Sequence, residues 1–170
     1  MKVYLDNNIV SGRVCDDLKP AEMAAVRKIE AAAECGELIV VTSRETWREQ
    51  DRTRDADLRS QLEQDRANVE VVREDHRMLG ARANYDNHGN WYGTSPILTE
   101  IVDEELFAAL MKEGLKDADA RHFMYAVQNG CDRFVTNDHH FLKDRRPRLE
   151  ALGRGTLIQR PSDLVAELGL

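Results

Sequence analysis

The sequence predicts an α/β fold, a three-layer α/β/α sandwich around a mainly parallel central sheet. Short apolar runs alternate with segments of helical periodicity along the chain, and this alternation favours parallel strands joined by helices. The run Leu38–Val41 is continuous, apolar and branched, as is typical of a strand buried on both faces. With 170 residues, of which 42% are hydrophobic, we expect a single domain spanning residues 1–170.

The first half of the chain contains three predicted strands and two helical regions. Lys2–Leu5 is β-prone and ends in the turn-forming residues Asp6 and Asn7, so it is the first strand. A loop follows, and then a helix that Pro20 can open and Gly36 can end. After the strand at residues 38–41, the charged stretch from residue 43 to about 68 predicts a long helix or a helix pair. Residues 69–72 return to strand character.

An irregular insertion is expected at about residues 76–101, because this stretch is rich in Asn, Gly, Tyr and His. Trp91 and Tyr92 within it have two interpretations. They can stack on unpaired bases, as aromatic side chains do in proteins that bind single strands. They can also cover an edge of the hydrophobic core, which is the interpretation we favour.

The last third of the chain returns to alternating helices and strands. Apolar spacing predicts a helix at 104–113 that buries Leu106, Leu110 and Met111, and Gly130 marks the end of a second helix at 119–129 that buries Phe123, Ala126 and Val127. The remaining expected elements are a strand at 133–135, a short helix near Leu149, a strand at 156–158 and a last helix opened by Pro161.

Composition limits the functional classes. Lys and Arg number 24 against 31 Asp and Glu, and the formal charge of −7 argues against a surface that coats nucleic acid non-specifically. The cysteines are three and widely spaced, which fits neither a disulfide framework nor a thiolate metal site. No N-terminal targeting signal and no apolar stretch of membrane-spanning length is evident. We therefore expect a cytoplasmic protein that does not enter a membrane.

Four acidic residues are predicted to meet at one edge of the sheet. In parallel sheets, ligands bind beyond the carboxyl ends of the strands. Asp6 directly follows the first strand, and Asp138 follows the strand that ends near Val135. The helix after the strand at 38–41 and the helix before the strand at 133–135 also begin at this edge. We therefore expect Glu49 from the first helix and Asp119 from the second to lie there as well.

Two nearby acids compete with this assignment. Thr42-Ser43-Arg44-Glu45 fits a capping box, in which the Glu side chain bonds the backbone at the helix start, so Glu45 is interpreted as structural. Asp117 precedes the predicted helix by two residues and is interpreted as a solvated loop residue.

The chemistry expected of Asp6, Glu49, Asp119 and Asp138 is metal binding. One pair of carboxylates about 4 Å apart repels by roughly 4 kcal/mol at an effective dielectric constant near 20, so such a group needs cations. Oxygen ligands suit Mg²⁺ or Mn²⁺, which also bind phosphate oxygens and can activate water for phosphodiester hydrolysis. Asn8 and Thr136 lie at the same edge, and we expect them to orient the carboxylates.

Taken together, four segments resemble a PIN domain: Tyr4 to Asn8, Ser43 to Glu49, Asp119 to Ala126, and Gly130 to Asp138 with Thr136-Asn137-Asp138. The resemblance implies that the four acids are the metal-binding and catalytic quartet and that Thr136 is the polar residue before the last Asp. It also implies an endoribonuclease, a role as the toxin of a toxin–antitoxin pair, and an antitoxin protein as partner.

Basic and histidine side chains near this edge are weaker candidates. Arg44, Arg48 and Arg52, continued by Arg54, lie at helical spacing and could contact an RNA backbone, although a solvated helix face explains them equally well. His122 is predicted to be a packed helix residue. The pair His139 and His140 is expected in an exposed loop with no assigned role.

Three other functions compete with an RNA nuclease. A phosphatase of the haloacid dehalogenase type needs a second acid two residues after Asp6, where this chain has Asn8. A non-catalytic interaction protein could use the same fold to bind a partner or to form a homodimer. A nuclease acting on DNA is chemically allowed, because metal-activated water does not need the ribose 2′-hydroxyl.

Overall fold

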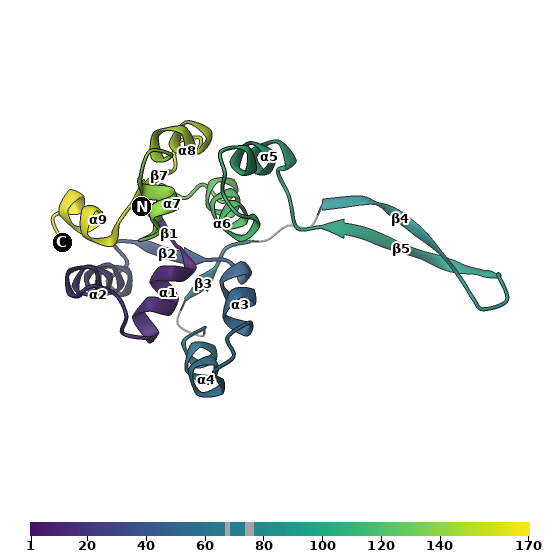
Figure 1. Ribbon diagram of the computed structural model, residues 1–170, viewed down its shortest axis with the longest axis horizontal. Coiled ribbons are helices and arrows are strands. Elements are labelled where there is room, and N and C mark those ends of the chain that lie inside the picture. Colours follow the sequence, from purple (N-terminus) through teal and green to yellow (C-terminus); the bar gives the residue numbers. More distant parts are fainter. Residues whose placement is uncertain (67–68, 74–76) are drawn as a thin grey trace.

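A five-stranded parallel sheet forms the centre of the protein, as seen in a computed structural model that describes residues 1–66, 69–73 and 77–170 (Figure 1). The strand order is β3-β2-β1-β6-β7, and every neighbouring pair is parallel. The predicted α/β class with a parallel sheet is therefore confirmed. The strands of this sheet are β1 (Lys2–Leu5), β2 (Ile39–Thr42), β3 (Glu70–Val71), β6 (Arg133–Val135) and β7 (Leu157–Gln159).

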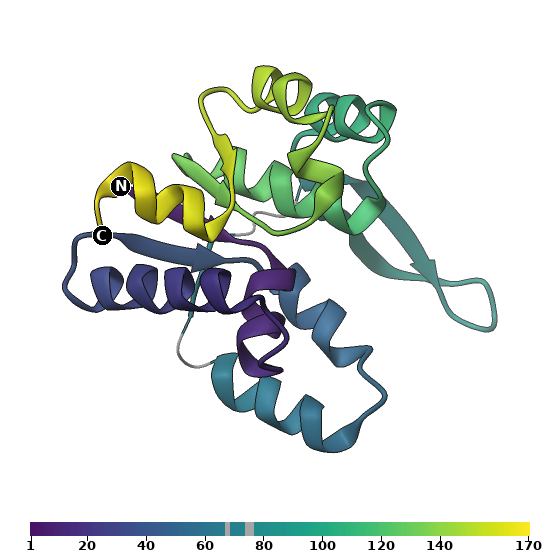
Figure 2. The same cartoon turned by 60° about the vertical axis from the view of Figure 1, so that its left-hand side comes forward.

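Helices cover both faces of the sheet (Figure 2). Alternate residues of each strand point to opposite sides, and apolar side chains on both sides need to be buried. Val3 and Leu5 pack under α1, α2 and α9, whereas Tyr4 and Phe134 pack on the other face with residues of α5, α6, α7 and α8. Among the described residues, no helix has the length and apolar character needed to cross a bilayer. The helices are α1 (Asn7–Val14), α2 (Pro20–Glu34), α3 (Arg44–Asp51), α4 (Ala56–Asp65), α5 (Glu104–Lys112), α6 (Asp117–Gln128), α7 (His139–Leu142), α8 (Arg146–Leu152) and α9 (Pro161–Leu168).

Local sequence signals explain most helix ends. Pro20 and Pro161 open α2 and α9, and the segment that follows α6 turns at Gly130, which has a φ of +63°. Gly36 likewise adopts a positive φ after α2. The charged stretch after β2 forms the helix pair α3 and α4, and the part of that prediction at residues 67–68 lies outside the described residues.

Several predicted details are wrong. The loop expected after the first strand is largely the helix α1, and a short helix, α7, follows Asp138. Ile39 begins β2 with 52% of its surface exposed, so this strand is buried on both faces only toward its end. Met111 is 40% exposed on α5, because only the side of that helix carrying Leu106 and Leu110 faces α6 and the core.

The insertion is not irregular. Within the described residues it forms an antiparallel hairpin, with β4 (Arg77–Tyr85) paired to β5 (Trp91–Thr99); His76, its predicted start, lies outside them. Figure 1 shows the hairpin projecting from the rest of the protein. Trp91 and Tyr92 are 63% and 68% exposed, so the prediction that they cover a core edge is also wrong.

Candidate acidic site at the carboxyl edge of the sheet

The carboxyl ends of β1 and β6 lie side by side in the middle of the sheet. Leu5 is in register with Val135, and the backbone N–H of Asp6 donates to the Val135 carbonyl at 3.0 Å. From β1 the chain builds β2 and β3 on one side, and later builds β6 and β7 on the other. Such a reversal of strand order is where open parallel sheets bind ligands. Residues that follow these two strands therefore lie at the edge where sheets of this kind bind ligands.

Asp6 is buried at this edge within a polar network. Its Oδ2 accepts hydrogen bonds from Thr136 Oγ1 at 2.7 Å and from Asn8 Nδ2 at 2.5 Å, while its Oδ1 accepts from the Asn7 backbone at 2.7 Å. Asn8 Nδ2 also donates to Thr136 Oγ1 at 2.8 Å. Asn8 and Thr136, the two polar residues expected to orient the carboxylates, thus both contact Asp6.

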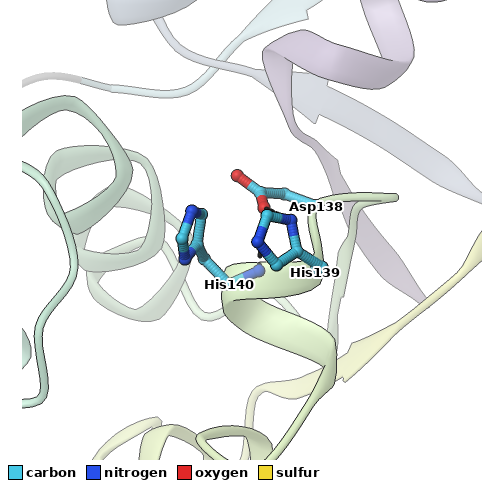
Figure 3. Close-up of side chains that lie close together, drawn as sticks. All are labelled: Asp138, His139 and His140. Carbon is cyan, nitrogen blue, oxygen red and sulfur yellow. Dashed lines mark hydrogen bonds and ion pairs between the residues drawn. The ribbon is translucent and has the colours of Figure 1, made fainter.

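Asp138 is joined to this network through Thr136. The Asp138 backbone N–H donates to Thr136 Oγ1 at 3.0 Å, and its Oδ1 accepts from the His140 backbone at 2.8 Å, so Asp138 caps α7. The imidazole Nδ1 of His139 lies 3.4 Å from the same oxygen. Figure 3 shows the carboxylate of Asp138 beside the rings of both histidines.

Glu49 contacts a buried histidine that the sequence had placed in the core. Its Oε2 lies 3.2 Å from Nε2 of His122, whose Nδ1 lies 2.7 Å from the Tyr4 hydroxyl. The Tyr4 hydroxyl donates to Ser43 Oγ at 2.6 Å, so both ring nitrogens of His122 face acceptors, which suits the imidazolium form. The one sequence signal for this role was spacing, since His122 stands three residues after Asp119 on one helix.

The pKa of His122 is raised above its ordinary value. Burial is the largest influence and lowers it, but the hydrogen bond with Glu49 and the charges of Asp6, Glu49 and Glu45 together outweigh burial. The pKa of Glu49 is lowered overall. Burial alone would raise it, but this effect is outweighed by the hydrogen bond and charge of His122, a hydrogen bond from Asn7 and the charge of Arg52. These contacts therefore favour the protonated form of His122, whose positive charge would face the acidic group.

Asp119 lies in the first turn of α6 and not at its N-cap. The backbone N–H of Lys116, the N-cap residue, bonds its carboxylate, which is half of a capping box. The sequence predicts Asp117 in a solvated loop, and this is wrong, because Asp117 is the first residue of the helix. Its side chain is 60% exposed and pairs with Arg121 at 2.7 Å, so it stands apart from the acidic group.

Electrostatic coupling links all four acids. Burial raises the pKa of Asp6 to about 6; His122 and Thr136 oppose this rise, and the charges of Glu49 and Asp119 add to it. The pKa of Asp119 is raised by burial first, and then by the charges of Asp138 and Glu49. The charges of neighbouring acids thus raise the pKa of both Asp6 and Asp119, and a bound cation would relieve this repulsion.

The ligand atoms of these acids are not tightly clustered. Among the described residues, the one group of three His, Cys, Asp or Glu side chains with ligand atoms all within 4.8 Å of one another is Asp138, His139 and His140 (Figure 3). Both oxygens of Asp6 already accept hydrogen bonds. Carboxylate oxygens are ligands that suit Mg²⁺ or Mn²⁺. For all four acids to hold one ion, either water molecules would bridge between ion and carboxylates, as Mg²⁺ usually allows, or the side chains would shift.

The α3 segment differs from the prediction at its start. Thr42 ends β2, Ser43 is the N-cap without a side-chain capping bond, and the predicted capping box is therefore wrong. Glu45 is buried and bonds Arg48 at 3.0 Å.

The predicted basic face is partly neutralised. Arg48 also pairs with Glu100, which follows β5, so its guanidinium is shared between two carboxylates. Arg44 lies exposed on α3, and Arg52 follows that helix as its C-cap.

Comparisons of the chain with known protein families, with curated proteins and with solved structures found no match.

Proposed function

We propose that this protein is a metal-dependent nuclease with a PIN-like fold that hydrolyses RNA phosphodiester bonds. The observation that carries the proposal is the coupled group of Asp6, Glu49, Asp119 and Asp138 at the point where the strand order reverses. Structural acids are normally separated or paired with cations, whereas Asp6 and Asp119 have pKa values raised by burial and by the charges of neighbouring acids, which is typical of a functional site. The resemblance of the motifs to PIN domains supports the same conclusion.

In this proposal each acidic side chain has a distinct task. Asp6 and Asp138, bridged by the Thr136 hydroxyl, would hold the cation at the sheet edge, and Glu49 and Asp119 would complete its ligands from the helix side. When bound, Mg²⁺ or Mn²⁺ would acidify an attacking water and offset charge on the phosphate. Glu49 is held by His122, and that ion pair lets the imidazolium balance the site before the cation binds.

Cleavage of a fluorescent single-stranded RNA tests the proposal. We expect cleavage in Mg²⁺ or Mn²⁺, none in EDTA, and loss of cleavage in Asp6→Asn and in Asp138→Asn. Asp117→Asn is the matched control, because it removes an exposed acid from the same helix as Asp119 and should cleave normally. Unchanged cleavage in both site variants would refute the assignment of the acids.

A metal titration gives a second readout that is independent of substrate. Ten millimolar Mn²⁺ at a Kd of about 0.1 mM would stabilise the folded protein by about 2.7 kcal/mol, because only the folded chain gathers the acids. The accompanying rise in Tm should be present in Asp117→Asn and absent in Asp138→Asn. A non-catalytic interaction protein with the same fold would show no metal-dependent rise in either.

The choice of RNA, and a role as a toxin with an antitoxin partner, are supported only by the PIN resemblance. Metal-activated water cleaves DNA by the same chemistry, so an RNA and a DNA oligonucleotide of the same sequence should be compared. Preference for RNA would support the proposed substrate, and equal or faster cleavage of DNA would support the DNA nuclease instead. Growth arrest on expression, relieved by a co-expressed small protein, would support the toxin role.

A further inference from the structure

The β4–β5 hairpin, which we call the arm, exposes large apolar side chains along its length. It projects from the rest of the molecule in both views (Figures 1 and 2), and within residues 79–99 it contributes no side chain to either hydrophobic core cluster. An exposed apolar surface of this extent marks an interaction site. Its large exposed side chains are Leu79, Tyr85, Trp91, Tyr92, Ile97 and Leu98.

The arm differs from the rest of the protein in its net charge. Residues 77–99 contain two Arg and one Asp, a formal charge of +1, so the remainder of the chain carries −8. The single acid, Asp86, is held in the turn, where it accepts hydrogen bonds from the backbones of His88 and Asn90. Both strands are therefore free of acidic residues. An anionic polymer meets less repulsion here than over the rest of the surface.

Aromatic side chains gather at the tip of the arm. Tyr85 is paired directly across the ladder with Trp91, and Tyr92 follows; each is at least 60% exposed. Exposed aromatic rings stack on unpaired bases, and every base offers such a face. Further along the ladder, Arg82 lies opposite Ser95, so a cation follows the aromatic tip toward the root of the arm.

The root of the arm is fixed to the helices that carry two of the candidate acids. Glu100, directly after β5, pairs with Arg48 of α3 through both carboxylate oxygens and with Arg121 of α6 at 3.3 Å. The Tyr125 hydroxyl donates to the Glu100 carbonyl at 2.9 Å. Arg48 is the neighbour of Glu49, and Arg121 lies two residues after Asp119. A nucleic-acid strand bound along the arm would therefore extend toward the acidic group.

We propose that the arm binds unpaired bases of the nucleic acid whose backbone is cleaved at the acidic group; this rests on the proposed nuclease function. The substrate would then be single-stranded, or contain an unpaired segment long enough to reach from the tip to the root. A second copy of the chain is a weaker occupant. Pro96 removes a backbone donor from β5 and so blunts that edge against added strands.

Trp91 fluorescence tests stacking without any need for cleavage. The chain has two tryptophans, and Trp47→Phe leaves Trp91 as the sole reporter while keeping an aromatic ring over Arg66. In EDTA, a 12-nucleotide RNA should quench this fluorescence in a saturable way, and its fully paired duplex should not. Equal quenching by both, or by neither, would overturn the proposal.

Binding of the labelled single strand should respond to aromatic and not to aliphatic changes. We expect Tyr85→Ala and Trp91→Ala each to weaken binding by about fivefold or more, since one stacked base contributes a factor of this size. Ile97→Ala is the matched control on the same arm and should bind normally. If instead all three changes convert a sedimenting dimer into a monomer, the arm covers a second copy and the proposal is wrong.

The quenching and cleavage experiments distinguish failure of the arm proposal from failure of the nuclease proposal. Saturable quenching in a protein that cleaves nothing would sink the nuclease function and leave the arm as a single-strand binding element. Metal-dependent cleavage with no quenching and unchanged binding in the aromatic variants would sink the arm alone. If both proposals hold, Asp138→Asn retains quenching and loses cleavage, and Trp91→Ala raises KM with little change in kcat.

Discussion

The buried carboxyl of Asp6 makes a prediction that requires neither metal nor substrate. Its pKa is raised from 3.8 to about 6, chiefly by burial. The folded protein thus holds this proton more tightly than the unfolded chain, so the free energy of unfolding falls as pH rises from about 4 to above 6. A shift of about two units corresponds to about 3 kcal/mol, because each unit is 1.36 kcal/mol.

Asp6→Asn isolates this contribution, because an amide does not titrate. The variant also carries a fixed penalty: Oδ2 of Asp6 accepts from both Thr136 and Asn8, and an amide NH₂ in that place would face two donors. This penalty is the same at every pH. The informative quantity is therefore the difference in stability between wild type and variant, followed across pH.

Urea unfolding in EDTA at pH 4, 5, 6, 7 and 7.5 measures that difference. Between the two ends of the series it should move by about 2.4 kcal/mol in favour of the variant, somewhat less than the full value of about 3 kcal/mol because the unfolded carboxyl is already partly ionised at pH 4, with most of the change between pH 4 and 6. Asp117→Asn, which removes an exposed carboxyl outside the acidic group, is the control measured in the same series. Parallel curves for Asp6→Asn, within about 1 kcal/mol, would show that Asp6 ionises normally and is not buried as described.

Three further predictions concern the surroundings of the site. Thr136→Val keeps the shape of a fully buried side chain but removes the hydroxyl that bonds Asp6, and urea unfolding should show a loss of about 1–3 kcal/mol. In NMR titration, His122 should have a pKa above 6.5, and Glu49→Gln should lower it, because the bond with Glu49 is the largest influence that raises it. Replacing residues 79–98 by a short Gly-Ser linker should change the free energy of unfolding by less than about 1 kcal/mol, or about 2–4 °C in Tm, since the arm lies outside the core.

The elements that the sequence predicted well are those whose local pattern agrees with their burial. The strand Arg133–Val135 has the predicted bounds, and the helix before it ends near Gly130, as its apolar spacing and its terminal glycine indicated. The sites of Asp6 and Asp138 followed from strand ends alone. Parallel strands bring their carboxyl ends to one edge whatever the details of the loops, so this part of the site needed only the strand positions.

The errors arose where the local pattern carries little information. The helix Asn7–Val14 begins with two asparagines, which favour turns, and its start is fixed by the side chain of Asp6. None of residues 79–99 of the arm is buried, so its strands lack the alternation by which half-buried strands are recognised. His122 meets Tyr4 across 118 positions of sequence, a contact that no local spacing reveals.

The position of the imidazolium explains how the acidic group can exist in the folded chain before any cation is present. Four coupled carboxylates would destabilise the sheet edge, but His122 lowers the pKa of Asp6, Glu49 and Asp119 from within the core. Burial is the largest influence on Asp6, and together with the charges of Glu49 and Asp119 it holds the pKa of Asp6 near 6 despite this histidine. In the proposed nuclease, a divalent ion rather than a further buried side chain would supply the remaining positive charge, because an ion can bind after folding and at the exposed side of the group.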